Sequence, residues 1–280
     1  MSELTVRNPA IEFEQSLPHW NPSEPEFSQI NNAASTVLPH LEPYLIKVLR
    51  LAKEELREEL QEDRDKKLRD DIDLFIRQEA NHYKLHRRYN ETLYANGYDG
   101  LKDHERVLAD DYRSFLSERS LKFNVAYCEG FESLGLIQAE FMFNHAGHWL
   151  KDADEAVRSL WEWHLAEEYE HRRVCYDVYK RLYGGYFYRL YGLIFAIRHL
   201  EGYGKRTSKF LIKQDRQQGA IRSGARSWWR ETRYRVRLSS FGLFKLCRTL
   251  SPFYNPSRLK VPEAIAKRLA SDELLTAPAL

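Results

Sequence analysis

The sequence predicts an all-α protein: a ferritin-like four-helix bundle that holds a dinuclear metal site and carries additional C-terminal helices. Apolar residues recur at helical spacing along most of the chain, and no segment shows the sustained alternation of a β-strand. In four predicted helices, acidic or imidazole side chains interrupt the apolar face that a helix normally buries. Because an unpaired buried charge is costly, we expect these side chains to be paired or bound to metal.

Composition divides the chain into four parts. We expect residues 1–30, which hold four prolines, to form an N-terminal arm. Residues 31–182 carry the metal-binding bundle. Residues 183–250 are rich in aromatic and basic side chains, and we expect a helical extension packed on the bundle. Residues 251–280 form the C-terminal tail.

The bundle needs four long helices. Apolar periodicity predicts the first from about residue 30 or 39 to 56, and then helices over about 71–95, 120–149 and 154–179. A short helix over about 102–116 lies in the connection between the second and third. One longer connection of this kind is typical of ferritin-like bundles.

The ligand types follow an order along the four helices: one Glu, a Glu-x2-His pair, a second Glu, and the pattern His-x3-Glu-x2-His. Residues three and four apart share a helix face, so each pair can reach one site. Dinuclear sites in such bundles use one Glu from each of two helices and a Glu-x2-His pair from each of the other two. The predicted metal ligands are Glu42, Glu79, His82, Glu129, His164, Glu168 and His171.

Among these ligands we expect Glu79, Glu129 and Glu168 to take part in catalysis. Glu129 and Glu132 share one face of the third helix, and we favour Glu129 as the ligand. Residues near the ligands are expected to support them or to line the pocket: His86, Glu132, Cys128, Cys175 and Asp177.

Carboxylates with imidazoles suit two iron ions, with manganese or zinc as alternatives. The alternative without metal is that the pairs Glu79–His82 and Glu168–His171 are surface ion pairs within their helices. Their apolar neighbours favour the metal site.

Two stretches resemble a bacterial family of predicted metal-dependent hydrolases. They are Phe-Ile-Arg-Gln-Glu-Ala-Asn-His-Tyr-Lys-Leu-His-Arg-Arg-Tyr-Asn over residues 75–90, and Trp-Glu-Trp-His-Leu-Ala-Glu-Glu-Tyr-Glu-His over 161–171, followed by Val-Cys-Tyr-Asp-Val-Tyr over 174–179. The resemblance covers about residues 5–250. The family's third helix reads roughly Leu-Glu-His-Phe-Thr-Ala, which implies Glu129 as a ligand. Gly130 and Glu132 depart from that pattern.

The order of the ligands also resembles that of the diiron arylamine N-oxygenases, and this resemblance is limited to the motifs. Those enzymes hold two irons with three His and four Glu. The seven predicted ligands reproduce that set in order, which implies a redox-active diiron centre but does not identify a substrate.

Our first functional hypothesis is therefore a diiron enzyme that activates O₂ to oxidise a small apolar, amine-bearing or aldehyde-bearing substrate, and that needs an electron donor. The second is a dinuclear metal-dependent hydrolase of an ester or phosphate. The third is a non-catalytic metal storage or scaffold protein.

The net charge of +2 conceals a strong asymmetry. Residues 180–260 hold nineteen Lys and Arg against three acidic residues, a balance of +16. We expect this basic third to dock on the acidic body or on a second subunit of a homodimer, with contact to an anionic membrane as the alternative. No motif supports nucleic-acid binding. Three isolated cysteines, and no apparent signal peptide or transmembrane run, predict a cytoplasmic protein, with a peripheral position at the inner face of the membrane as the alternative.

Overall fold

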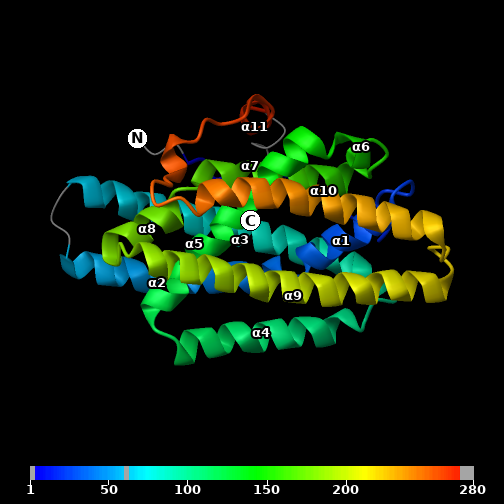
Figure 1. The fold of residues 1–280 in the computed structure, drawn as a ribbon, viewed down its shortest axis with the longest axis horizontal. Helices are drawn as coiled ribbons and strands as arrows, with labels where there is room; N and C mark the ends of the chain where they lie inside the picture. The colour runs from blue at the N-terminus through cyan, green and yellow to red at the C-terminus, as the bar shows by residue number, and fades with distance from the viewer. Residues whose placement is uncertain (1–3, 60–62, 272–280) are drawn as a thin grey trace.

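The computed structural model describes residues 4–59 and 63–271, and within them it contains helices and no strand. Four long helices form the bundle: α2 (Leu38–Glu59), α3 (Asp63–Ala95), α5 (Leu121–His145) and α7 (Glu155–His171). Helix α2 packs on α3, α3 on α7, α7 on α5, and α5 on α2 (Figure 1). These contacts close a ring around one core and confirm the predicted all-α bundle.

The remaining helices surround this ring. Helix α4 (Leu101–Glu118) lies in the connection between α3 and α5, on the outside of α2 (Figure 1). Helices α9 and α10 run antiparallel along the length of the bundle. The full set of additional elements is α1 (Pro25–Ser35), α4, α6 (Gly147–Leu150), α8 (Val174–Leu182), α9 (Tyr186–Gln218), α10 (Ala225–Thr249), η1 (Pro256–Arg258) and α11 (Glu263–Leu269).

The first bundle helix starts close to the second of the two predicted positions, near residue 39, but the segment before it differs from the prediction. A separate helix, α1, begins at Pro25, and α2 begins only at Leu38. Pro39 lies in the first turn of α2, where a missing backbone N–H costs little. Pro43 lies inside the helix. Helix α3 begins at Asp63, before the predicted start near residue 71. Residues 60–62 lie outside the described residues.

The fourth predicted helix is two helices. Helix α7 begins after Asp154, whose side chain accepts a hydrogen bond from the backbone N–H of Val157, as an N-cap should. It ends at His171, and α8 begins at Val174. The third predicted helix is also shorter than expected, since α5 ends at His145.

Helix α9 lies directly against α5 because two glycines allow their backbones to approach. A Cβ on Gly192 would lie 2.5 Å from the carbonyl oxygen of Ala126. A Cβ on Gly130 would lie 2.8 Å from the Cα of Leu193. The departure from the family pattern at Gly130 is thus a packing feature: a larger side chain would hold α9 away from the bundle.

Basic side chains of the C-terminal third pair with acidic side chains from earlier in the chain. Arg230 Nε lies 2.8 Å from Glu26 Oε2, and Arg233 Nη2 lies 2.6 Å from Glu24 Oε1. Lys245 and Arg248 both contact Glu140 on α5. Part of the charge asymmetry is therefore neutralised within the chain. None of the described helices combines the length and apolarity that a membrane span requires.

Candidate metal centre

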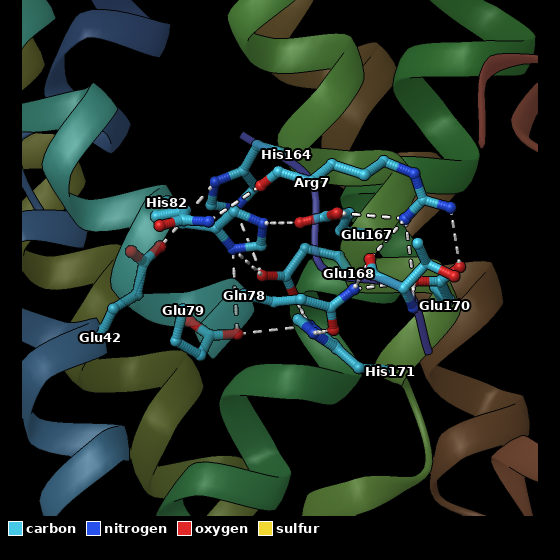
Figure 2. Close-up of polar contacts among 12 residues, drawn as sticks. Arg7, Glu42, Gln78, Glu79, His82, His164, Glu167, Glu168, Glu170 and His171 are labelled. Atoms are coloured by element: carbon cyan, nitrogen blue, oxygen red, sulfur yellow. Dashed lines mark hydrogen bonds and ion pairs between the residues drawn. The ribbon is translucent and has the colours of Figure 1, made fainter. Parts of the chain in front are cut away.

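Acidic and imidazole side chains of α2, α3 and α7 point toward one another in the middle of the bundle (Figure 2). They form two groups that share one residue. Within each group the possible ligand atoms lie within 4.8 Å of one another, and every member is buried. The first group is Glu42, His82, His164 and Glu168, and the second is Glu79, Glu168 and His171.

Glu168 lies between the two groups and directs one oxygen to each. Its Oε1 lies 3.3 Å from His164 Nε2, and its Oε2 lies 3.4 Å from His171 Nε2. Glu79 also spans the groups: its Oε1 lies 3.4 Å from His171 Nε2 and 3.9 Å from His82 Nδ1. Two carboxylates thus face both groups of possible ligands.

Eleven carboxylate and imidazole atoms of the cluster lack hydrogen-bond partners among the described residues, although they are buried. Leaving such atoms unsatisfied costs free energy, so a missing partner is expected. Donor atoms that each lie about 2.1 Å from a cation are themselves separated by about 3 to 4 Å, which matches the spacings here. The unsatisfied atoms are both oxygens of Glu42, Glu79, Glu132 and Glu168, Nδ1 of His82 and His164, and Nε2 of His171.

The carboxylates resist ionisation when no cation is present. Burial, reinforced by repulsion from Glu168 and other neighbouring carboxylates, raises the pKa of Glu42, Glu79 and Glu132 well above the ordinary value. Burial acts on Glu168 in the same direction, but His171 and His164 outweigh it and lower the pKa of Glu168. A cluster with this electrostatic character favours the binding of positive charge.

We predicted that Glu129 is a ligand in this cluster, but the structure does not bring it there. Arg189 of α9 donates a hydrogen bond to Glu129 Oε1 at 3.0 Å. Glu132, one turn further along α5, has its Oε2 3.4 Å from His171 Nε2. Both residues lie on the inward side of α5, but the cation from α9 neutralises only Glu129. Glu132, which we expected to support the ligands, is the α5 carboxylate that faces them.

Two residues that the sequence analysis missed orient the imidazoles. His82 Nε2 lies 2.9 Å from Glu167 Oε2, so an N–H donated there leaves Nδ1 directed at the cluster. His171 Nδ1 lies 3.2 Å from Gln78 Oε1, which leaves Nε2 directed at the cluster. Metal-binding histidines commonly donate their second N–H in this way. One signal in the sequence could have found them: Gln78 and Glu167 are buried polar residues that directly precede the predicted ligands Glu79 and Glu168.

The N-terminal arm completes this support. Arg7 donates to Glu167 Oε1 at 3.1 Å and to Glu170 Oε2 at 3.0 Å (Figure 2). The Gln78 amide nitrogen donates to Glu170 Oε2 at 2.7 Å, which fixes its carbonyl oxygen toward His171. Burial raises the pKa of Glu167 to about 8, and Arg7 opposes that rise. The arm therefore helps to position both imidazoles.

The other residues expected near the ligands occupy different environments. His86 Nδ1 lies 2.9 Å from Ser35 Oγ, and its ring packs 4.9 Å from the His164 ring. Cys128 and Cys175 are buried, and burial together with the nearby charge of Glu132 raises the pKa of both thiols. Asp177 instead forms an ion pair with Arg173.

Gly135 of α5 makes room for the shared carboxylate. A Cβ at this position would lie 2.6 Å from Glu168 Oε2, well inside van der Waals contact. The absence of a side chain therefore lets Glu168 lie close to α5 while it faces both groups.

A cavity of about 370 Å³ adjoins the cluster, with His164 and Glu168 in its wall. Its other lining residues come from α1, the turn between α1 and α2, the start of α2, α5, α7, α9 and α10, and most are apolar. They are Ile30, Ala34, Val37, Leu38, Phe131, Leu134, Gly135, Gln138, Trp161, Leu165, Leu200, Glu201, Gly204, Lys205, Tyr234, Arg235, Leu238 and Ser239.

Comparison with known families agrees with a metal-binding role. The chain matches the model of the family described as predicted metal-dependent hydrolase over residues 5–259. The protein belongs to this family. Searches among curated proteins and solved structures found no match. The resemblance to diiron arylamine N-oxygenases is therefore not confirmed, and family membership supports the hydrolase alternative better.

Proposed function

We propose that this member of the metal-dependent hydrolase family binds two metal ions, bridged by Glu168, and uses them to hydrolyse an ester or phosphate held in the adjoining cavity. The observation that carries the proposal is the position of Glu168, whose two oxygens face two different sets of buried, unsatisfied donors. The proposed ligands are Glu42, Glu79, His82, Glu132, His164, Glu168 and His171, with Glu132 in place of Glu129.

Two divalent ions bound there would polarise the scissile group and lower the pKa of a coordinated water. The chain supplies the remaining requirements. Glu167 and Gln78 hold His82 and His171 in the required tautomers. Most residues that line the cavity beside His164 are apolar, so a substrate that fills it would displace water and strengthen electrostatic interactions within it.

A second candidate function, activation of O₂ by an iron pair, is favoured by the donor set. Four carboxylates and three imidazoles suit iron or manganese, and the arrangement of Glu and Glu-x2-His on four helices is the one found in diiron and dimanganese bundles. Ions that change valence would supply electrons to O₂ in that case, and the protein would need an external electron donor.

Metal stoichiometry tests the site itself. The full chain, freed of metal and reloaded with Fe(II), Mn(II) or Zn(II), should retain about two ions after desalting. Glu132→Gln should lower that content. Glu129→Gln is the matched control, because it removes a buried carboxylate from the same helix that is paired with Arg189. Equal metal loss in both folded variants, or none in either, would contradict the assignment of Glu132.

The two reactions are separated by their need for oxygen. Hydrolysis predicts turnover of a panel of carboxylic and phosphate esters under anaerobic conditions with Zn(II) or Mn(II). Oxygen activation predicts O₂ consumption and an absorbance change when the Fe(II)-loaded protein meets air. Ester turnover that survives loss of metal in the Glu168→Ala variant would contradict the hydrolase, and Fe(II)-loaded protein that consumes no O₂ would contradict oxygen activation.

A further inference from the structure

The cavity beside the cluster reaches the protein surface between α9 and α10. Its inner wall contains His164 and Glu168, which are buried. Glu201 and Lys205 of α9 and Ser239 of α10 also line it, and they are exposed. Because both sets of residues line one cavity, a molecule that enters between α9 and α10 can reach the proposed metal ligands.

The wall between these two ends suits an apolar molecule. Leu38, Phe131 and Leu134 contribute apolar side chains to it. Trp161 also lines the cavity, and its indole N–H is buried without an acceptor among the described residues. An occupant that is mostly apolar but carries one hydrogen-bond acceptor would satisfy that donor.

The opening carries more positive than negative charge. Lys205 and Arg235 are the cations that line the cavity, and Glu201 is its acidic residue at that end. Lys205 Nζ lies 2.8 Å from Glu201 Oε1, while Arg235 pairs with Glu231 at 3.0 Å. The Lys205–Glu201 pair is exposed, and such pairs hold together only weakly. Lys205 is therefore available to an anionic group at the opening.

We propose that the cavity binds a single-chain amphiphile, with its apolar body among the residues around Trp161 and an anionic carboxylate or phosphate end at Lys205. This inference deepens the proposed function and rests on it, because the part of the amphiphile that reacts would lie beside His164 and Glu168. The cavity volume of about 370 Å³ is near the lower end of the usual range for small-molecule sites, which favours one chain over a lipid with two.

Binding can be measured without turnover. The probe is 11-(dansylamino)undecanoic acid, added to the full chain with and without metal, and displaced by alkyl carboxylates of increasing length. Burial of each added CH₂ should strengthen binding by about three- to fourfold until the cavity is full. Alkyl phosphates and alkyl alcohols of matched length test the head group. Affinity that is independent of chain length would overturn the proposal.

Gly204 offers a way to block the cavity without disturbing its surroundings. It lines the cavity, and a Cβ built there meets no atom within 4 Å. Gly204→Leu should fill the space and weaken binding of long carboxylates by at least tenfold. The matched control is Gly202→Leu on the same helix, because Gly202 does not line the cavity and its Cβ would meet only the Arg206 side chain at 3.4 Å. Equal binding by both variants would overturn the proposal.

Lys205→Gln tests the head group. It should weaken binding of carboxylates and phosphates and leave binding of matched alcohols unchanged. Equal weakening of all three, or of none, would exclude an anionic end at Lys205. Metal content measured on the same samples separates the two proposals. Normal metal content without amphiphile binding refutes only this inference, whereas amphiphile binding without metal uptake refutes only the dinuclear site.

Discussion

The Glu167 carboxylate positions the His82 imidazole. Glu167 accepts from His82 and from Arg7, so its two oxygens connect the imidazole to the N-terminal arm. Glu167→Gln keeps the size of the side chain but leaves one oxygen acceptor where Glu167 has two, so it cannot accept from both His82 and Arg7. We expect metal affinity to fall about 10- to 100-fold, as is usual when a partner of a metal-binding histidine is changed. Competition with a fluorescent chelator measures this directly.

The control for that variant is Glu155→Gln, which changes an exposed carboxylate on the same helix. It should leave affinity unchanged. If folded Glu167→Gln protein bound metal as tightly as Glu155→Gln, the role assigned to Glu167 would be wrong.

Metal binding should release protons. Burial and neighbouring carboxylates raise the pKa of Glu42, Glu79 and Glu132, so these groups hold protons to a higher pH in the metal-free protein than ordinary carboxylates do. A cation must displace those protons, and metal affinity should therefore rise as pH rises from 6 to 8. Titration calorimetry in two buffers of different ionisation enthalpy counts the protons. No release, or affinity that falls with pH, would contradict the proposed ligand set.

Residue identities in the site could be predicted only in part. Two Glu-x2-His pairs on apolar helix faces were visible because ligand spacing and helix periodicity are both local. The choice between Glu129 and Glu132 was not, because they share a face and the deciding cation, Arg189, lies 60 residues further along the chain. Arg7 was equally hidden, since only folding brings the arm beside α7.

At the scale of elements, the contact between α5 and α9 depends on Gly192. A Cβ there would overlap the Ala126 backbone, which cannot move as a side chain can. Gly192→Ala should lower the free energy of unfolding by about 1 to 3 kcal/mol through overpacking, despite the better helix propensity of Ala. Urea denaturation measures the change.

Gly204→Ala on the same helix is the control, because its Cβ meets open space; stability there should stay the same or rise. Two equally stable variants would show that α5 and α9 do not approach as described.

Helix existence was predictable and helix ends were less so. The spacing of apolar residues predicted all four bundle helices and the short helix between the second and third. The break after His171 was not visible, because apolar spacing continues from Val157 through Val178. The early start of α1 at Pro25 was missed because its buried face is largely polar, with Asn31, Asn32 and Gln29 hydrogen-bonded to other segments.

For the molecule as a whole, metal removal should weaken the fold. The ring of α2, α3, α5 and α7 encloses four carboxylates whose repulsion a cation relieves. A ligand at 100 times its dissociation constant stabilises a protein by about 2.7 kcal/mol, which corresponds to an unfolding temperature roughly 5 to 10 °C higher for a chain of this size. Calorimetry before and after EDTA treatment measures the shift. Identical transitions for metal-loaded and metal-free protein would argue against a site inside the bundle.

Anomalous diffraction from metal-loaded crystals of the full chain tests the central claim most directly. Two peaks should appear about 3.5 to 4 Å apart, on either side of the Glu168 carboxylate, one among Glu42, His82 and His164 and the other among Glu79, Glu132 and His171. A single peak, or peaks only at the surface of the bundle, would contradict the dinuclear centre.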